Sequence, residues 1–287
     1  MKTAFQHLKR SSFIALSLLC LAILTAGCVG SHRGMETRKR STTVDFLYPG
    51  KDPVTTQPGV PAMTLPLDIG IAFVPEGGQR IGSGFSDEEK VRLLTSVADH
   101  FRDQPFIRNI EIIPTAYLKP GGGFANLDQI RSMFGVDVIA LVSYDQIQHT
   151  DERACSFAYL TVIGMYLVNG EENDTSTLLD TAVFHIPSRK LLFRAPGTSR
   201  LRGGATLVNV GRRLRQDSLA GMREANTNMT ANLSLELERF KQRVKEKPEE
   251  FRISHAPGYR GGGNLGGPFA MAIGLLLIAA HRGRNQR

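Results

Sequence analysis

The sequence is poor in the residue patterns that mark the commonest catalytic and metal sites. It has three cysteines in 287 residues, and no two of them form a paired-cysteine motif. Gly-x-Ser-x-Gly and His-Glu-x-x-His motifs are absent as well. The seven histidines are scattered without the spacing of metal ligands. The sequence therefore predicts no catalytic site, no metal and no cofactor, and we expect a protein that is not an enzyme.

Acidic residues are missing from both ends of the chain, and this accounts for most of its basic character. The formal net charge is +8. Residues 1–27 and residues 264–287 each carry three positive charges and no negative one, which leaves about two positive charges for the body. The basicity belongs to the terminal segments, so we expect no nucleic-acid partner.

The N-terminal segment has the anatomy of a secretory signal peptide. A basic stretch ends at Arg10, an apolar run occupies 13–26, and small residues lead to Gly27 and Cys28. The apolar run is shorter than the roughly 20 residues that a membrane-spanning helix needs. The sequence predicts that residues 1–27 are removed by cleavage between Gly27 and Cys28.

The junction itself resembles a lipobox, with Leu24, Ala26 and Gly27 in front of Cys28. This resemblance implies that lipoprotein-processing enzymes attach acyl chains (palmitate among them) to Cys28, which anchors the mature protein in membrane lipid. Val29 stands where an Asp would retain a lipoprotein in the inner membrane, so by analogy we expect the outer membrane of a Gram-negative bacterium. The alternative is a plain signal peptide with an unmodified cysteine.

Cys155 is the one cysteine left after Cys20 departs with the signal peptide and Cys28 is acylated. The secreted body is therefore expected to lack an intramolecular disulfide. Cys155 opens an apolar segment, which favours a small buried side chain over a reactive thiol.

The C-terminal tail carries three features in order. Glycines are followed by an apolar run at 268–280 and by a basic end at 281–287. The basic end beyond the apolar run would lie in the cytoplasm, with the body outside. Two alternatives are a retained transmembrane anchor, for which the run is marginal in length, and a helix packed on the domain.

This order resembles the GlyGly-CTERM sorting signal, and a lipoprotein with such a tail resembles the rhombotarget lipoprotein family. The resemblance implies cleavage by a rhombosortase, an intramembrane protease of the rhomboid family. The expected cleavage lies within Gly261, Gly262 and Gly263, with Gly266 and Gly267 as the second choice.

The body between these signals is expected to contain one domain. Residues 28–64 are rich in polar residues, Gly and Pro and predict a linker, residues 65–250 the domain, and residues 251–287 a Gly-rich linker with the tail. Ser86 and Glu89 fit a capping box at the start of a helix that includes Phe101. Alternation and helical periodicity predict further elements: strands at 67–73, 107–113, 136–144, 156–168, 178–186 and 190–194, and helices at 126–134 and 217–246.

The order of these elements predicts an α/β (α+β) fold, with a single mixed sheet, packed helices and a long C-terminal helix. The arrangement resembles loosely the α/β domain of the curli-secretion lipoprotein, which implies no shared activity. Gly82 to Gly84 stand where phosphate-binding loops occur, but they lack the remaining motif residues and favour an ordinary connection. The polar loop from His149 to Glu152 could hold a cation, which the pattern also does not favour.

For the function, we expect a non-enzymatic envelope lipoprotein with a binding or assembly role toward an unknown envelope protein partner. One alternative is a subunit of an export or pore assembly, which would form ring oligomers. The other is a hydrolytic enzyme with an unrecognised site, which would show titratable groups converging in a pocket.

Overall fold

The computed structural model describes residues 35–50, 58–76, 85–152, 171–206 and 208–259. Its chain divides into two compact units. Of the described residues, the smaller unit holds 35–36, 149–152, 171–173, 203–206 and 208–210. The larger unit holds the rest.

The main sheet is mixed, as the sequence predicts. Its strands are β1 (Met35–Arg40), β3 (Leu67–Phe73), β4 (Ile107–Ile112), β5 (Val138–Glu152), β6 (Glu171–His185) and β7 (Lys190–Ala205). They lie in the order β4-β3-β5-β6-β7, and β1 also pairs with β5. β3 runs parallel to both neighbours and aligns Ile69 with Ile110 on β4 and with Val138 on β5. A separate sheet pairs β2 (Ala62–Leu65) in parallel with β8 (Arg252–His255).

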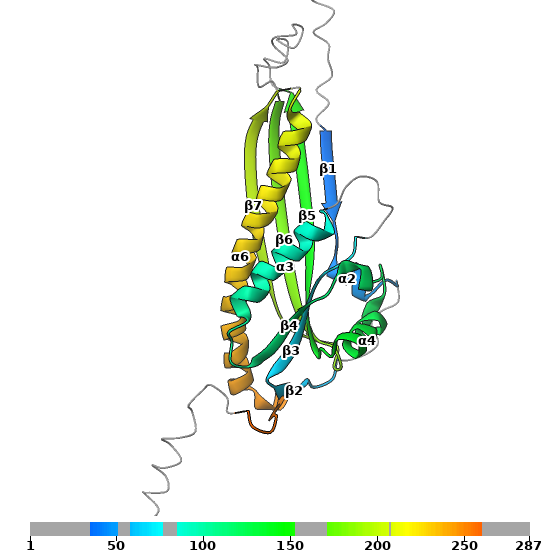
Figure 1. Cartoon of the computed structure of the whole chain (residues 1–287), viewed down its shortest axis with the longest axis vertical. Helices are drawn as coiled ribbons and strands as arrows, with labels where there is room; N and C mark the ends of the chain where they lie inside the picture. Colours follow the sequence, from blue (N-terminus) through cyan, green and yellow to red (C-terminus); the bar gives the residue numbers. More distant parts are fainter. Residues whose placement is uncertain (1–34, 51–57, 77–84, 153–170, 207, 260–287) are drawn as a thin grey trace, which may run out of the picture. The chain divides into compact units, whose positions relative to one another are not determined.

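Helices cover both faces of the parallel part of the sheet (Figure 1). They are α2 (Thr43–Leu47), α3 (Asp87–Phe101), α4 (Gly123–Phe134) and the 37-residue α6 (Val210–Glu246), with short 3-10 helices η1 (Thr115–Tyr117) and η3 (Pro248–Glu250). α3 and α6 lie on one face, and α2 and α4 lie on the other. The Ser86 side chain caps α3 by accepting a hydrogen bond from the Glu89 amide at 3.2 Å. Gly135 ends α4 with a φ of 68°, as a C-terminal cap requires.

The alternation of β3 divides the core into two layers. Ile71 and Phe73 pack with the α3 and α6 side chains, whereas Ala72 packs with those of α2 and α4. In β5 the even positions face α6 and the odd positions Ile139 and Leu141 face α4. Both faces of these strands are therefore buried, which explains their nearly continuous apolar sequence.

The described domain begins before and ends after the predicted limits. The predicted linker 28–64 contains β1, α2 and β2, and Phe46 and Leu47 of α2 are buried in the core. β8 lies beyond the predicted limit at residue 250. β1 was missed because its sequence is polar and shows no apolar alternation. The strand is held in the sheet by its backbone pairing with β5.

Three predicted segments lie outside the described residues: the signal peptide, the strand at 156–168 and the C-terminal apolar run. In the described part of the chain, no helix combines the length and apolar character needed to cross a membrane.

Candidate ligand-binding pocket

An apolar pocket of about 580 Å³ lies in the larger unit, between the main sheet and the helices α3 and α6. Its volume falls within the range of small-molecule sites, roughly 300–1,000 Å³. Strands β3, β4 and β5 supply one wall, α3 and the C-terminal half of α6 supply another, and β2 and β8 close one end. Apolar residues make up 22 of the 28 that line it. The wall is therefore more suited to a hydrocarbon surface than to a polar substrate.

Local periodicity places the apolar side chains in the pocket wall. The two-residue repeat of β3 directs Leu67, Ile69 and Ile71 to the same face of the sheet. Steps of three and four residues place Leu233, Leu237, Phe240 and Val244 on one stripe of α6. Leu67, Ile69 and Val244 are only half-buried, although they pack against the core. The two walls thus expose apolar surface to the pocket instead of filling it.

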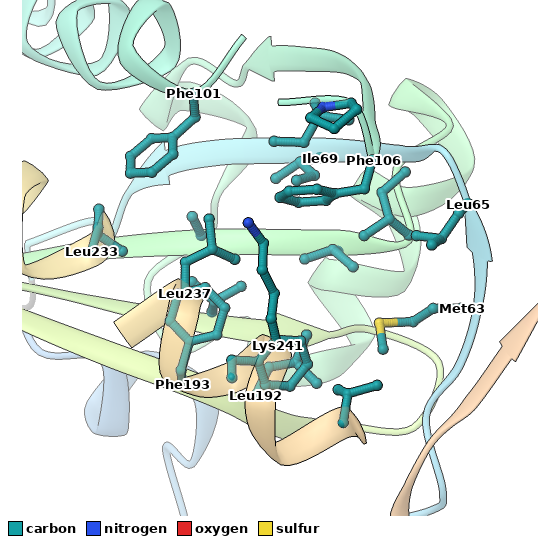
Figure 2. Close-up of a pocket in the computed structure, with 18 of the residues that line it drawn as sticks. Met63, Leu65, Ile69, Phe101, Phe106, Leu192, Phe193, Leu233, Leu237 and Lys241 are labelled. Carbon is teal, nitrogen blue, oxygen red and sulfur yellow. The ribbon is translucent and has the colours of Figure 1, made fainter. Parts of the chain in front are cut away.

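The polar groups of the pocket come from two segments only. They are Glu238, Lys241, Gln242 and Lys245 of α6, with His255 and Tyr259 at and beyond β8. Figure 2 shows Lys241 extending from α6 into the pocket among apolar side chains. Its Nζ atom lies 2.7 Å from Glu238 Oε1 and 4.8 Å from the centroid of the Phe106 ring. The Lys241 ammonium group therefore lies inside the pocket, close to the ring of Phe106.

The ring of His255 stacks on that of Tyr259 at a centroid distance of 5.7 Å. Both side chains line the pocket, as do Lys241 and Lys245. The wall can therefore hold an apolar chain against its many hydrocarbon side chains and a polar group against its few polar ones.

A second group of titratable side chains lies away from the pocket, where the parallel strand β3 ends. The Tyr144 hydroxyl donates a hydrogen bond to Glu76 Oε1, and the Lys90 Nζ atom lies 3.5 Å from the same oxygen. Burial, followed by this hydrogen bond to Glu76, raises the pKa of Tyr144 above its ordinary value. Burial lowers the pKa of Lys39, against the attraction of Glu76. Lys90 and Tyr144 are buried and satisfied by Glu76, so this cluster serves as a structural link between α3 and β5.

The structure does not describe most of the residues that the sequence singled out. Gly27 and Cys28, the tail glycines Gly261 to Gly267, the loop glycines Gly82 and Gly84, and Cys155 all lie outside the described residues. Their predicted roles in lipidation, cleavage and packing stay predictions.

The predicted polar loop from His149 to Glu152 is not a loop, because the strand predicted to end at residue 144 continues as β5 to Glu152. In the smaller unit, the His149 Nδ1 atom lies 3.9 Å from Glu36 Oε2, and both side chains are largely exposed. Within the described ranges, no group of three or more His, Cys, Asp or Glu side chains could hold a metal ion.

Sequence reasoning did not find the pocket. It assigned Leu233, Phe240 and Val244 to the apolar face of a helix and the alternating β3 residues to a strand. The same pattern arises whether two apolar faces touch or enclose a space, so it carries no signal for a pocket. The pocket could have been inferred from one signal, the polar residues within the apolar stripe of α6, of which Lys241 is the clearest.

No family model and no curated protein matches this chain. Several solved structures are similar to it at low identity, three of them from Helicobacter, Xanthomonas and Neisseria. A homologue of neuraminyllactose-binding hemagglutinin from Helicobacter pylori has 9% identity and a TM-score of 0.40, over 68% of this chain and 96% of that one. The DUF330 family-model protein XCC0632 from Xanthomonas campestris has 13% identity and a TM-score of 0.30, over 68% and 96%.

Lipoprotein GNA1162 from Neisseria meningitidis has 12% identity and a TM-score of 0.23, over 53% of this chain and 96% of that one. At these TM-scores the likenesses carry no argument about function.

Proposed function

We propose that this chain is a cell-envelope lipoprotein whose domain binds an apolar ligand without catalysing a reaction. The binding part is carried by one observation, the pocket of about 580 Å³ with its predominantly apolar wall. Apolar surface that faces water costs about 25 cal/mol for each Å². A ligand with a hydrocarbon body would remove this surface from water, which supplies the driving force for binding.

The chemistry of the pocket favours binding over hydrolysis. A hydrolytic site needs a nucleophile or an activated water, a base and a group that stabilises the developing charge, all within reach of one another. The Lys241 ammonium is instead paired with Glu238, and the other polar residues of the wall are Gln242, Lys245, His255 and Tyr259. Among the residues that the structure describes, no serine, threonine or cysteine lines the pocket as a candidate nucleophile. These features support a non-enzymatic role.

The cellular location and the processing of the two ends are proposed from the sequence alone. A basic stretch, an apolar run and Gly27–Cys28 support lipidation at Cys28 and outer-membrane anchoring. The glycines, the apolar run 268–280 and the basic end support cleavage of the tail by a rhombosortase. During maturation the chain would then interact with membrane lipid, the lipoprotein-processing enzymes and a rhomboid-family protease. The mature domain would serve an envelope protein whose identity is unknown.

Mass spectrometry of both terminal peptides tests the proposed location and processing. Protein purified from fractionated Gram-negative envelopes is expected to begin with acylated Cys28 and to end between Gly261 and Gly267, in the outer-membrane fraction. An unmodified N-terminus, or a tail intact through Arg287 in the inner membrane, would contradict the proposed processing.

Photo-labelling tests the binding function. The full chain in lipid nanodiscs is exposed to decanol that carries a diazirine, and the labelled peptides are identified by mass spectrometry. Labels are expected on α6 and on β3 or β4. Ile253→Asp places a carboxylate at a 36% exposed position of the pocket wall. It is expected to reduce this labelling about fivefold or more, since a hydrocarbon chain bound there would remove the unpaired charge from water.

The matched control is Met133→Asp, which introduces the same charge at a side chain that is 62% exposed on α4. It is expected to leave the labelling unchanged. Equal labelling of wild type and Ile253→Asp, or labels spread over other surfaces, would overturn the binding function.

A further inference from the structure

The polar side chains of the pocket lie on two segments only, and most of the charged ones are positive. Lys241 and Lys245 stand one helical turn apart on the same face of α6, and both line the pocket. Glu238 is the single acidic side chain in the wall. An apolar ligand that fills the pocket therefore meets two ammonium groups and one carboxylate of α6 in its wall.

Glu238 holds Lys241 only weakly. The Glu238 side chain is 66% exposed and that of Lys241 is 32% exposed, so water competes for both charges. An exposed pair three residues apart on a helix contributes little to stability. The Lys241 ammonium can therefore exchange this carboxylate for an anion of a ligand at small cost.

Lys245 is available to the same anion. Among the described residues it has no ion-pair partner within 4.0 Å, whereas Lys247 just beyond the helix is paired with Glu250 at 3.2 Å. The partial negative charge at the C-terminus of α6 opposes an anion nearby. Two full positive charges on Lys241 and Lys245 exceed this partial charge, which is about half of one unit.

We propose that the ligand is a single-chain anionic amphiphile, whose hydrocarbon chain fills the pocket and whose carboxylate or phosphate meets Lys241 and Lys245. This rests on the proposed binding function and names its ligand class. Free fatty acids and single-chain phospholipids share this chemistry. The diacylglyceryl group expected on Cys28 is uncharged at its head, so the charge preference also separates an external ligand from the chain's own lipid.

Three competitors with the same ten-carbon chain test the head group. The full chain in nanodiscs is labelled with the diazirine-bearing decanol, and decanoate, decanol or decyltrimethylammonium competes at pH about 8, where a carboxylate is charged. Decanoate is expected to compete about tenfold more strongly than decanol, because hydrogen bonds between charged groups are the stronger ones. The cation is expected to compete least.

Lys241→Met retains the length and apolar stem of the side chain and removes its charge. This variant is expected to lose most of the advantage of decanoate over decanol while still binding decanol. Lys247→Met, outside the pocket wall, makes the same change of charge at the same end of α6 and is expected to retain the advantage. Decanol labelling of Lys241→Met also reports that the variant is folded.

The outcomes separate the two proposals. Equal competition by decanoate and decanol, or an advantage that survives in Lys241→Met, overturns the anionic ligand class and leaves the binding function intact. Absence of pocket labelling by the diazirine-bearing decanol, with the tail present and with it removed, overturns the binding function itself. Labelling that appears only after removal of residues 264–287 would assign the pocket to the chain's own apolar tail and would also overturn the amphiphile. If decanoate instead has the expected advantage, palmitate-like or lysophospholipid masses extracted from the purified chain identify which source supplies the ligand.

Discussion

Gly197 of β7 lies directly against the backbone of α6. A Cβ atom on this glycine would stand 2.2 Å from the carbonyl oxygen of Ala225 and 2.4 Å from the backbone nitrogen of Met229. Both are main-chain atoms in the middle of a helix, so neither can rotate away. The glycine therefore sets how closely the sheet and α6 approach each other.

Gly197→Ala is expected to lower the free energy of unfolding by about 3 kcal/mol, at the upper end of the cost of overpacking, since the backbone must shift. Chemical unfolding of the full chain, followed by circular dichroism, measures the change. Gly211→Ala is the control, because the nearest atom to its added Cβ would be Arg215 Nη1 at 4.0 Å. This helical substitution is expected to be neutral or to stabilise by up to about 1 kcal/mol. A neutral Gly197→Ala would show that β7 and α6 are not in close contact.

A second prediction concerns the polar contact between β5 and α6. Gln146 is buried; its Nε2 atom donates to Thr177 Oγ1 at 2.8 Å and to the Ser218 carbonyl at 3.0 Å. The Ser218 hydroxyl donates back to Gln146 Oε1 at 2.5 Å. Gln146→Leu removes all three hydrogen bonds and leaves the buried hydroxyls of Thr177 and Ser218 without this partner, which is expected to cost about 1–3 kcal/mol of stability.

A double-mutant cycle with Ser218→Ala checks this prediction. If the two side chains act as one unit, the double variant is expected to lose less stability than the sum of the single losses. Thermal unfolding of the four proteins supplies the data. Additive losses would show that Gln146 and Ser218 do not interact.

The same polar contact explains which strands could be predicted from the sequence. Alternating apolar residues revealed β3 and the nearer part of β6, and Leu179 and Val183 of β6 indeed lie in the core beneath α6. Farther along, the inward positions of β6 are Thr177, Thr175 and Asn173, which are buried but polar. Apolar alternation stops there, so the predicted strand begins at residue 178 although β6 begins at Glu171.

β7 shows the same limit for a different reason. The prediction ended this strand at residue 194, whereas it continues to Ala205. Its next inward residues, Ala195, Gly197 and Ser199, are small because α6 lies close to the sheet. Small residues carry almost no hydrophobic signal, so close packing concealed the strand. The start of α3 and the end of α4 were easier, since Ser86 and Gly135 mark helix ends by local chemistry. The start of α6 was predicted at residue 217, whereas the helix begins at Val210.

A third prediction concerns Tyr144, whose hydroxyl donates to Glu76 while its ring packs edge to face with Phe73 and Phe85. Tyr144→Phe retains the ring contacts and removes a hydrogen bond to a carboxylate. We expect a loss of about 1–2 kcal/mol in the free energy of unfolding, below the full value for a charged partner because Glu76 is partly exposed.

Tyr117→Phe provides the matched control, because it also removes a tyrosine hydroxyl, but at a side chain that is 45% exposed. Its loss is expected to stay below about 0.5 kcal/mol. Equal effects of the two substitutions would mean that the Tyr144 hydroxyl contributes nothing through Glu76.

The last prediction concerns the pH dependence of stability at His185. This side chain is buried at the end of β6, and its Nδ1 atom accepts a hydrogen bond from the Ser188 backbone amide at 3.3 Å. A protonated ring has no free lone pair at Nδ1, so charging it would break that bond. Burial, which opposes the charge, lowers the pKa of His185 below its ordinary value of 6.5, although Asp137 attracts the proton.

The sign of the effect follows from proton binding in the two states. At a pH below 6.5 the unfolded chain binds a proton at this position that the folded chain does not, so the free energy of unfolding rises with pH. The contribution of His185 is fully present above pH 6.5 and is lost as the pH falls from there toward the lower pKa of the folded state. His185→Gln is expected to flatten this part of the stability profile, measured by urea unfolding at a series of pH values. His100→Gln, at an exposed position, is expected to leave the slope in place. An unchanged slope in His185→Gln would show that another group causes the acid sensitivity.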